Sequence, residues 1–151
     1  MKKSELQQII KEEIKKVKKV LKETQLEPYR KGKMEYSAYG YKLTKVPNVD
    51  KLLSQIKEVD GYLDLSRSDV TTLPNNLEID GYLSLSNTKI ETLPKGLVVK
   101  GDLDILNCKK LKFPLPNDLV VRGNLVLNTK SVNKEELKRQ LPNVSSVIIM
   151  P

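Results

Sequence analysis

The chain repeats one twenty-residue pattern between residues 59 and 120. Residues 59–78 read VDGYLDLSRSDVTTLPNNLE, residues 79–98 read IDGYLSLSNTKIETLPKGLV, and residues 99–120 carry the same frame with two inserted residues. A fixed period of about 20–29 residues indicates short units that stack, because one such unit cannot bury its apolar face alone. The period therefore predicts a solenoid, and solenoids more often build binding surfaces than active sites.

Within each repeat the pattern predicts one strand followed by a return segment. Residues 59–65 alternate apolar and polar side chains, which predicts a strand with Leu63 and Leu65 directed inward. Val70, Leu73 and Leu77 are expected to turn inward from the return side. A glycine recurs among the inward strand positions, where it would allow close backbone approach or a bulge. Replacing Gly81 by valine is expected to overpack the core. The recurring glycines are Gly61, Gly81, Gly101 and Gly123.

This pattern resembles leucine-rich repeats. The segment Leu83-Ser-Leu85-Ser-Asn-Thr88-Lys-Ile90 follows the family motif, and the Leu-Pro pairs at 73–74 and 93–94 are similar to the short bacterial class found in secreted effectors. Similar Gly-x-Leu-x-Leu coils are familiar in phage-encoded proteins. The resemblance covers residues 59–132, extends more weakly to 43–49, and implies an α/β solenoid with a parallel sheet. The family's asparagine ladder is occupied here by Ser68, Thr88, Cys108 and Lys130, so Cys108 is expected to be structural.

The N-terminal third holds most of the positive charge. Residues 1–50 contain 13 Lys and Arg against 7 Asp and Glu, out of a net charge of +8 for the whole chain. Apolar residues spaced three or four apart predict a long amphipathic helix over 4–25, with Ser4 and Gln7 as its capping box. Its apolar stripe would pack on the open end of the solenoid, self-associate or dock on a partner, or lie on an anionic membrane or nucleic acid.

Tyrosine and basic residues alternate in residues 27–41. Aromatic rings among cations can hold single-stranded nucleic acid by stacking and charge. The alternative is a linker whose tyrosines pack on the first coil. The candidate nucleic-acid contacts are Tyr29, Arg30, Lys31, Lys33 and Tyr36.

The repeats define the expected domain organisation. Residues 1–42 form the N-terminal helix and linker, and residues 43–151 form the solenoid. The solenoid would comprise a degenerate first coil at 43–58, repeats at 59–78, 79–98 and 99–120, and a capping coil at 121–151. Leu43 is aligned with Ile90, and Asp50 is expected to cap a short helix at 50–58. In the last coil, Asn133 with Glu136 predicts a helix at 134–141. Residues 144–150 predict a final strand beside Leu125 that closes the sheet edge.

The outward strand positions form three columns that are expected to make a concave binding face. The face is acidic at one end, becomes basic along one column, and offers two tyrosines as anchors for a protein partner. Clustered acids would repel phosphate there. The alternative is a solvated sheet face with no partner. The columns are Asp60, Asp80, Lys100 and Arg122; Tyr62, Tyr82, Asp102 and Asn124; and Asp64, Ser84, Asp104 and Val126.

Composition argues against enzyme chemistry. The chain has no histidine and one cysteine, and it shows no metal-ligand spacing and no glycine-rich phosphate loop. No cofactor or metal is expected, and no apolar run is long enough to span a membrane. The charged N-terminus is unlike a signal peptide, so a cytoplasmic location is expected, or the host cytoplasm or virion for a phage protein.

The predicted function is a non-enzymatic protein–protein interaction module. A phage structural component and an inhibitor of a host protein both fit this prediction. The helix could also form a homo-oligomer or dock on the partner. The alternative function is nucleic-acid association through the basic N-terminal arm.

Overall fold

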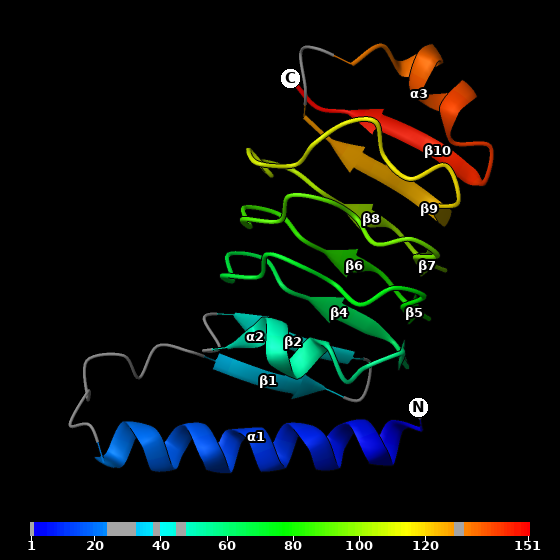
Figure 1. The fold of residues 1–151 in the computed structure, drawn as a ribbon. Helices are drawn as coiled ribbons and strands as arrows, with labels where there is room; N and C mark the ends of the chain where they lie inside the picture. Colours follow the sequence, from blue (N-terminus) through cyan, green and yellow to red (C-terminus); the bar gives the residue numbers. More distant parts are fainter. Residues whose placement is uncertain (1, 24–32, 38–39, 45–47, 129–131) are drawn as a thin grey trace.

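The computed structural model describes residues 2–23, 33–37, 40–44, 48–128 and 132–151 and has an α/β architecture (Figure 1). Within these residues one sheet contains ten strands, of which β1 and β2 pair antiparallel while the other pairs run parallel. The elements are α1 (Lys3–Glu23), β1 (Lys33–Ser37), β2 (Gly40–Thr44), α2 (Val49–Leu53), β3 (Glu58–Val59), β4 (Tyr62–Asp64), β5 (Glu78–Ile79), β6 (Leu83–Ser84), β7 (Val98–Val99), β8 (Leu103–Asp104), β9 (Val120–Leu127), α3 (Lys134–Gln140) and β10 (Val144–Ile149).

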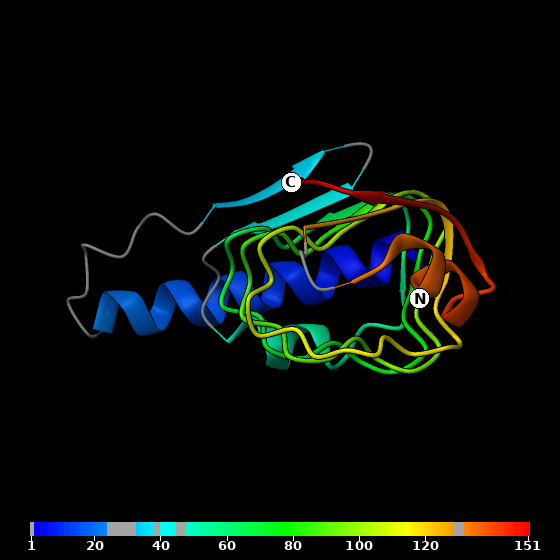
Figure 2. The same ribbon diagram turned by 90° about the horizontal axis from the view of Figure 1, so that it is seen from above.

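The repeats stack in the register that their period predicts. Leu63 pairs with Leu83, Leu83 with Leu103, and Leu103 with Leu125 along the row β4, β6, β8 and β9. A second row, formed by β3, β5, β7 and the start of β9, runs beside the first. Viewed along the stack, the repeats overlie one another (Figure 2). The paired leucines are fully buried, so each repeat contributes one layer to a continuous aliphatic core.

Each repeat bends where one continuous strand was expected. The prediction of a single strand over 59–65 is wrong, because β3 ends at Val59 and β4 begins at Tyr62. Gly61 lies at this bend with φ of +86°, which glycine adopts readily. Gly81 N–H donates to Gly61 O at 2.7 Å, and a Cβ on Gly81 would lie 2.7 Å from Gly61 C. The repeating glycines are therefore required by backbone contact between repeats rather than by core side chains.

Helix α1 packs across the N-terminal end of the stack (Figure 1). Leu6 and Ile10 are buried in the same core as the repeats, which agrees with the first of the three packing alternatives for this part of the helix. The predicted cap at Ser4 is wrong, because the helix begins at Lys3. The Glu5 carboxylate instead accepts a hydrogen bond from Lys2 N–H at 3.0 Å, which satisfies one donor of the first turn. Residues 24–25 of the predicted helix lie outside the described residues.

The segment expected to be a linker contains a hairpin. Strands β1 and β2 pair antiparallel, and β2 continues the sheet by pairing with β4. Lys42 is opposite Asp64, so Leu43 occupies the position of Leu65 and not that of Ile90 as predicted. The expected boundary after residue 42 falls inside β2. Val46 and Pro47 of the degenerate coil lie outside the described residues.

Asp50 does not cap α2. Asn48 is the N-cap residue, in a left-handed conformation with no side-chain capping bond. The Asp50 carboxylate instead accepts hydrogen bonds from Thr71 N–H at 2.9 Å and Thr71 Oγ1 at 2.6 Å. Asp50 therefore ties α2 to the first full repeat, a long-range role that local spacing does not reveal.

The C-terminal end follows the prediction. Asn133 Oδ1 accepts from the backbone N–H groups of Glu135 and Glu136 at 2.8 and 3.3 Å, and α3 follows. Strand β10 pairs parallel with β9, with Val147 opposite Leu125. The last coil thus adds a strand to the sheet at the point where the repeat pattern ends.

Candidate functional site

The outward residues of 60–64, 80–84, 100–104 and 122–126, which run along β4, β6, β8 and β9, form the face that the sequence singled out, here called the strand face. In its middle column the rings of Tyr62 and Tyr82 stack, with centroids 4.9 Å apart and an interplanar angle of 5°. The twenty-residue register produces this contact, because it places the two tyrosines at the same position of neighbouring strands. Tyr82 remains 42% exposed, one of the most exposed large apolar side chains in the described chain.

Two aspartates beside the tyrosines hold the strand ends. Asp64 Oδ1 accepts from Ser66 N–H at 2.9 Å, and Asp104 Oδ1 accepts from Leu106 N–H at 2.9 Å. Among the described residues their other oxygens make long contacts: Asp64 Oδ2 is 3.8 Å from Lys42 Nζ, and Asp104 Oδ2 is 3.5 Å from Ser84 Oγ. Each carboxylate therefore keeps acceptor capacity on Oδ2.

Ser84 lies between these aspartates in the same column. It was predicted to contact a partner, but only 8% of it is exposed. Its hydroxyl lies 3.3 Å from Ser86 Oγ. Ser84 therefore contributes to the support beneath the strand face more than to its surface.

Two residues of the first column, Asp80 and Lys100, are paired with each other. Lys100 Nζ contacts Asp80 Oδ1 at 2.6 Å and Glu78 Oε1 at 2.7 Å. Hydrogen bonds to Asp80 and then to Glu78 hold the pKa of the Lys100 ammonium above its ordinary value. Carboxylate oxygens of Glu58, Asp60 and Asp80 lie within 4.8 Å of one another, and these are the acids that could approach a cation. The Lys100 ammonium already balances charge beside Asp80, so this group carries no metal assignment.

The middle column begins with the two tyrosines and ends with a hydrogen-bonded pair, Asp102 and Asn124. Asp102 Oδ1 accepts from the N–H of Asn124 at 2.7 Å and from its side-chain amide at 3.2 Å. The carboxylate is thus turned toward the next coil, and Arg122 is exposed beyond it. Sequence reasoning located these residues on one face but could not foresee that Asn124 would orient Asp102.

The electrostatics of the strand face are reflected in Tyr82. Partial burial, then the nearby Asp64 carboxylate, and then Tyr62 raise the pKa of the Tyr82 hydroxyl above its ordinary value. All three causes disfavour the negatively charged phenolate. Tyr82 therefore presents a neutral ring beside carboxylates, a combination that attracts cations and repels anions.

Cys108 is partly buried against the repeat core. Its thiol donates to Leu85 O at 3.0 Å and lies 3.6 Å from Thr88 Oγ1. Burial raises the pKa of the Cys108 thiol, which opposes formation of a reactive thiolate. This geometry matches the ladder role that the repeat pattern predicts.

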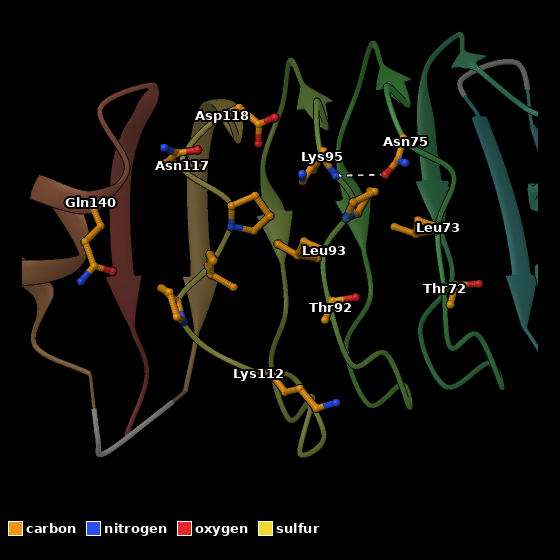
Figure 3. Close-up of a pocket in the computed structure, with 14 residues that line it drawn as sticks. Thr72, Leu73, Asn75, Thr92, Leu93, Lys95, Lys112, Asn117, Asp118 and Gln140 are labelled. Atoms are coloured by element: carbon orange, nitrogen blue, oxygen red, sulfur yellow. Dashed lines mark hydrogen bonds between the residues drawn. The ribbon is translucent and has the colours of Figure 1, made fainter.

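A groove that the sequence did not single out lies on the return segments of the repeats (Figure 3). Leu73 and Leu93 line it together with prolines. Polar side chains at its rim hold the turns: Asn75 Oδ1 accepts from Lys95 N–H at 3.2 Å, and Asp118 Oδ2 accepts from Gly96 N–H at 2.9 Å. Asn75 and Asp118 therefore have a structural role at this rim.

The candidate nucleic-acid contacts are placed only in part. Tyr29, Arg30 and Lys31 lie outside the described residues, and Lys33 and Tyr36 fall in β1. The nucleic-acid alternative therefore stays a prediction.

No family model, curated protein or solved structure matches the chain. Among the helices described, none has the length and apolar character needed to cross a membrane.

Proposed function

We propose that this chain is a short leucine-rich-repeat solenoid that acts as a non-enzymatic protein–protein interaction module. The parallel register of the repeats and the shared leucine core support the solenoid. Residues 43–151 would form its body and residues 1–42 its N-terminal extension. A phage structural component and an inhibitor acting in the host cytoplasm both fit this function.

The observation that carries the proposal is the exposed tyrosine stack on the strand face. Tyr62 holds one side of the Tyr82 ring, so little side-chain entropy is lost when a partner covers it. Large aromatic side chains of this kind are frequent energetic centres of protein interfaces. The surrounding Asp64, Asp102 and Asp104 would supply the polar rim and the charge preference of the site.

Partner capture tests the proposal. The full chain is immobilised and exposed to extract from its native source beside a Tyr82→Ala/Asp104→Lys double variant. A matched control, Asp69→Lys, reverses one charge at a side chain that is 76% exposed, is ion-paired with the exposed Lys89, and lies outside the strands. We expect the double variant to lose a protein that the wild type and the control retain. Equal capture by all three would move the binding surface away from the strand face.

The same samples test the nucleic-acid alternative. If the bound material is DNA or RNA, retention should fall steeply with added salt, because binding to phosphates releases counterions. It should also be unaffected by the double variant. That result would replace the interaction function with nucleic-acid association.

A further inference from the structure

In the column that contains the tyrosine stack, the side chains become shorter after Tyr82. Tyr62 covers one side of the Tyr82 ring, and the next residue of the column is Asp102, a much shorter side chain. Asp102 is directed toward the following coil by its hydrogen bond from Asn124 N–H. The side of the Tyr82 ring away from Tyr62 is therefore not covered by another ring, in keeping with its 42% exposure.

The space beside this ring is acidic. Asp102 follows Tyr82 in the middle column, and Asp104 lies two residues farther along the chain, at the end of β8. Within the described part of the chain, the Oδ2 atom of Asp104 has a single long contact, at 3.5 Å from Ser84 Oγ. Among the residues that the structure describes, Lys100 is bound to Asp80 and Glu78, and no ion pair joins Asp102 or Asp104 to a cation. A ligand entering here therefore meets an aromatic surface and carboxylates that none of these cations pairs with.

Of the cationic side chains, arginine fits this combination best. Its planar guanidinium can stack on an aromatic ring while its edge donates to carboxylates, whereas the lysine ammonium is compact and strongly hydrated. A guanidinium on the open side of Tyr82 would continue the ring stack by one repeat, since neighbouring strands are about 4.8 Å apart. The edge of the guanidinium would then face Asp102 and Asp104.

Resting on the proposed interaction function, we propose that the open side of Tyr82, with Asp102 and Asp104, binds an arginine side chain of the partner protein. Charge complementarity selects the occupant, because carboxylates border the ring on the side where it is uncovered. The stack with Tyr62 positions the Tyr82 ring for this contact.

Titration of the full chain with two capped peptides tests the inference. Gly-Arg-Gly is compared with Gly-Lys-Gly, and the ring resonances of Tyr62 and Tyr82 are followed by NMR. We expect saturable shifts with the arginine peptide and weaker binding of the lysine peptide. Tyr82→Leu should weaken arginine binding by about 3-fold to 30-fold, the range expected for loss of a cation–π contact. Tyr82→Phe, which keeps the ring, should retain binding and covers the case in which the leucine variant fails to fold.

The charge requirement has its own matched pair. Asp104→Asn removes the charge but keeps an oxygen that can accept from Leu106 N–H, and it should weaken binding by several-fold. Asp69→Asn removes the same charge from an exposed position outside the strands and should change the affinity less than about twofold. Equal affinity of both peptides, or arginine binding unaffected by Tyr82→Leu and Asp104→Asn, would overturn the inference.

This titration and the capture experiment can fail separately. A protein captured through the strand face, together with no arginine response, would overturn the arginine assignment alone. A clear arginine response without any partner that depends on the strand face would overturn the interaction function alone.

Discussion

The glycines between repeats give a direct prediction about stability. In Gly81→Ala the new Cβ would lie 2.7 Å from Gly61 C, 2.8 Å from Gly61 O and 2.8 Å from Tyr62 N. Ordinary carbon contacts are about 3.5–4.0 Å, so the overlap is close to 1 Å and involves backbone atoms that cannot rotate away. The Gly81 N–H bond to Gly61 O, at 2.7 Å, holds the two coils at this spacing.

Overpacking of this kind costs about 1–3 kcal/mol, and valine should cost more than alanine. For a chain of this size the loss corresponds to a fall in Tm of about 2–12 °C, measured by circular dichroism. Ser145→Thr is the control, because it adds a methyl group at an exposed strand position and should change stability by less than about 0.5 kcal/mol. A Gly81→Ala variant as stable as wild type would refute the close contact between repeats.

Three further variants or titrations test other contacts. Asp50→Ala should lower the free energy of unfolding by about 1–2 kcal/mol in urea denaturation, since it removes the acceptor for Thr71; an unchanged midpoint would dismiss this tie. Ultraviolet titration should show Tyr82 ionising above the ordinary tyrosine pKa, and Asp64→Asn should lower the pKa of Tyr82 partly toward that ordinary value. Because the pKa is raised in the folded state, the corresponding stability is fully present below the ordinary tyrosine pKa and is lost as the pH rises through the pKa of folded Tyr82. Cys108 should react with iodoacetamide more slowly in the folded chain than in urea, because burial raises its pKa; equal rates would contradict the buried geometry.

The repeat period was enough to predict the register of the sheet. Leu63, Leu83 and Leu103 align because a fixed period forces equivalent residues onto neighbouring strands. The period also predicted the tyrosine column, but not how its rings and carboxylates are oriented. Those orientations depend on contacts between coils, such as the one from Asn124 to Asp102.

The sequence-based predictions were wrong where the repeat pattern weakens or where tertiary contacts determine the local structure. Apolar alternation across residues 59–65 could not show the bend at Gly61, because glycine fits both a strand and a turn. The hairpin before the repeats was missed although Met34 and Tyr36, then Tyr41 and Leu43, alternate with polar residues. The many basic and aromatic residues of the segment 27–41 favoured the interpretation as a linker instead. The prediction for Asp50 was wrong because its place before a short helix suggested a cap, whereas its carboxylate accepts hydrogen bonds from Thr71 of the next repeat.

Site-specific photo-cross-linking tests most directly whether the strand face is the binding surface. A benzophenone amino acid is placed at position 126 on the strand face, which leaves Tyr82 in place, or at position 75 in the groove of the return segments. We predict that position 126 forms a cross-link to a partner protein that excess wild type suppresses and excess Tyr82→Ala/Asp104→Lys does not. A cross-link from position 75 alone, or suppression by both competitors alike, would contradict the account.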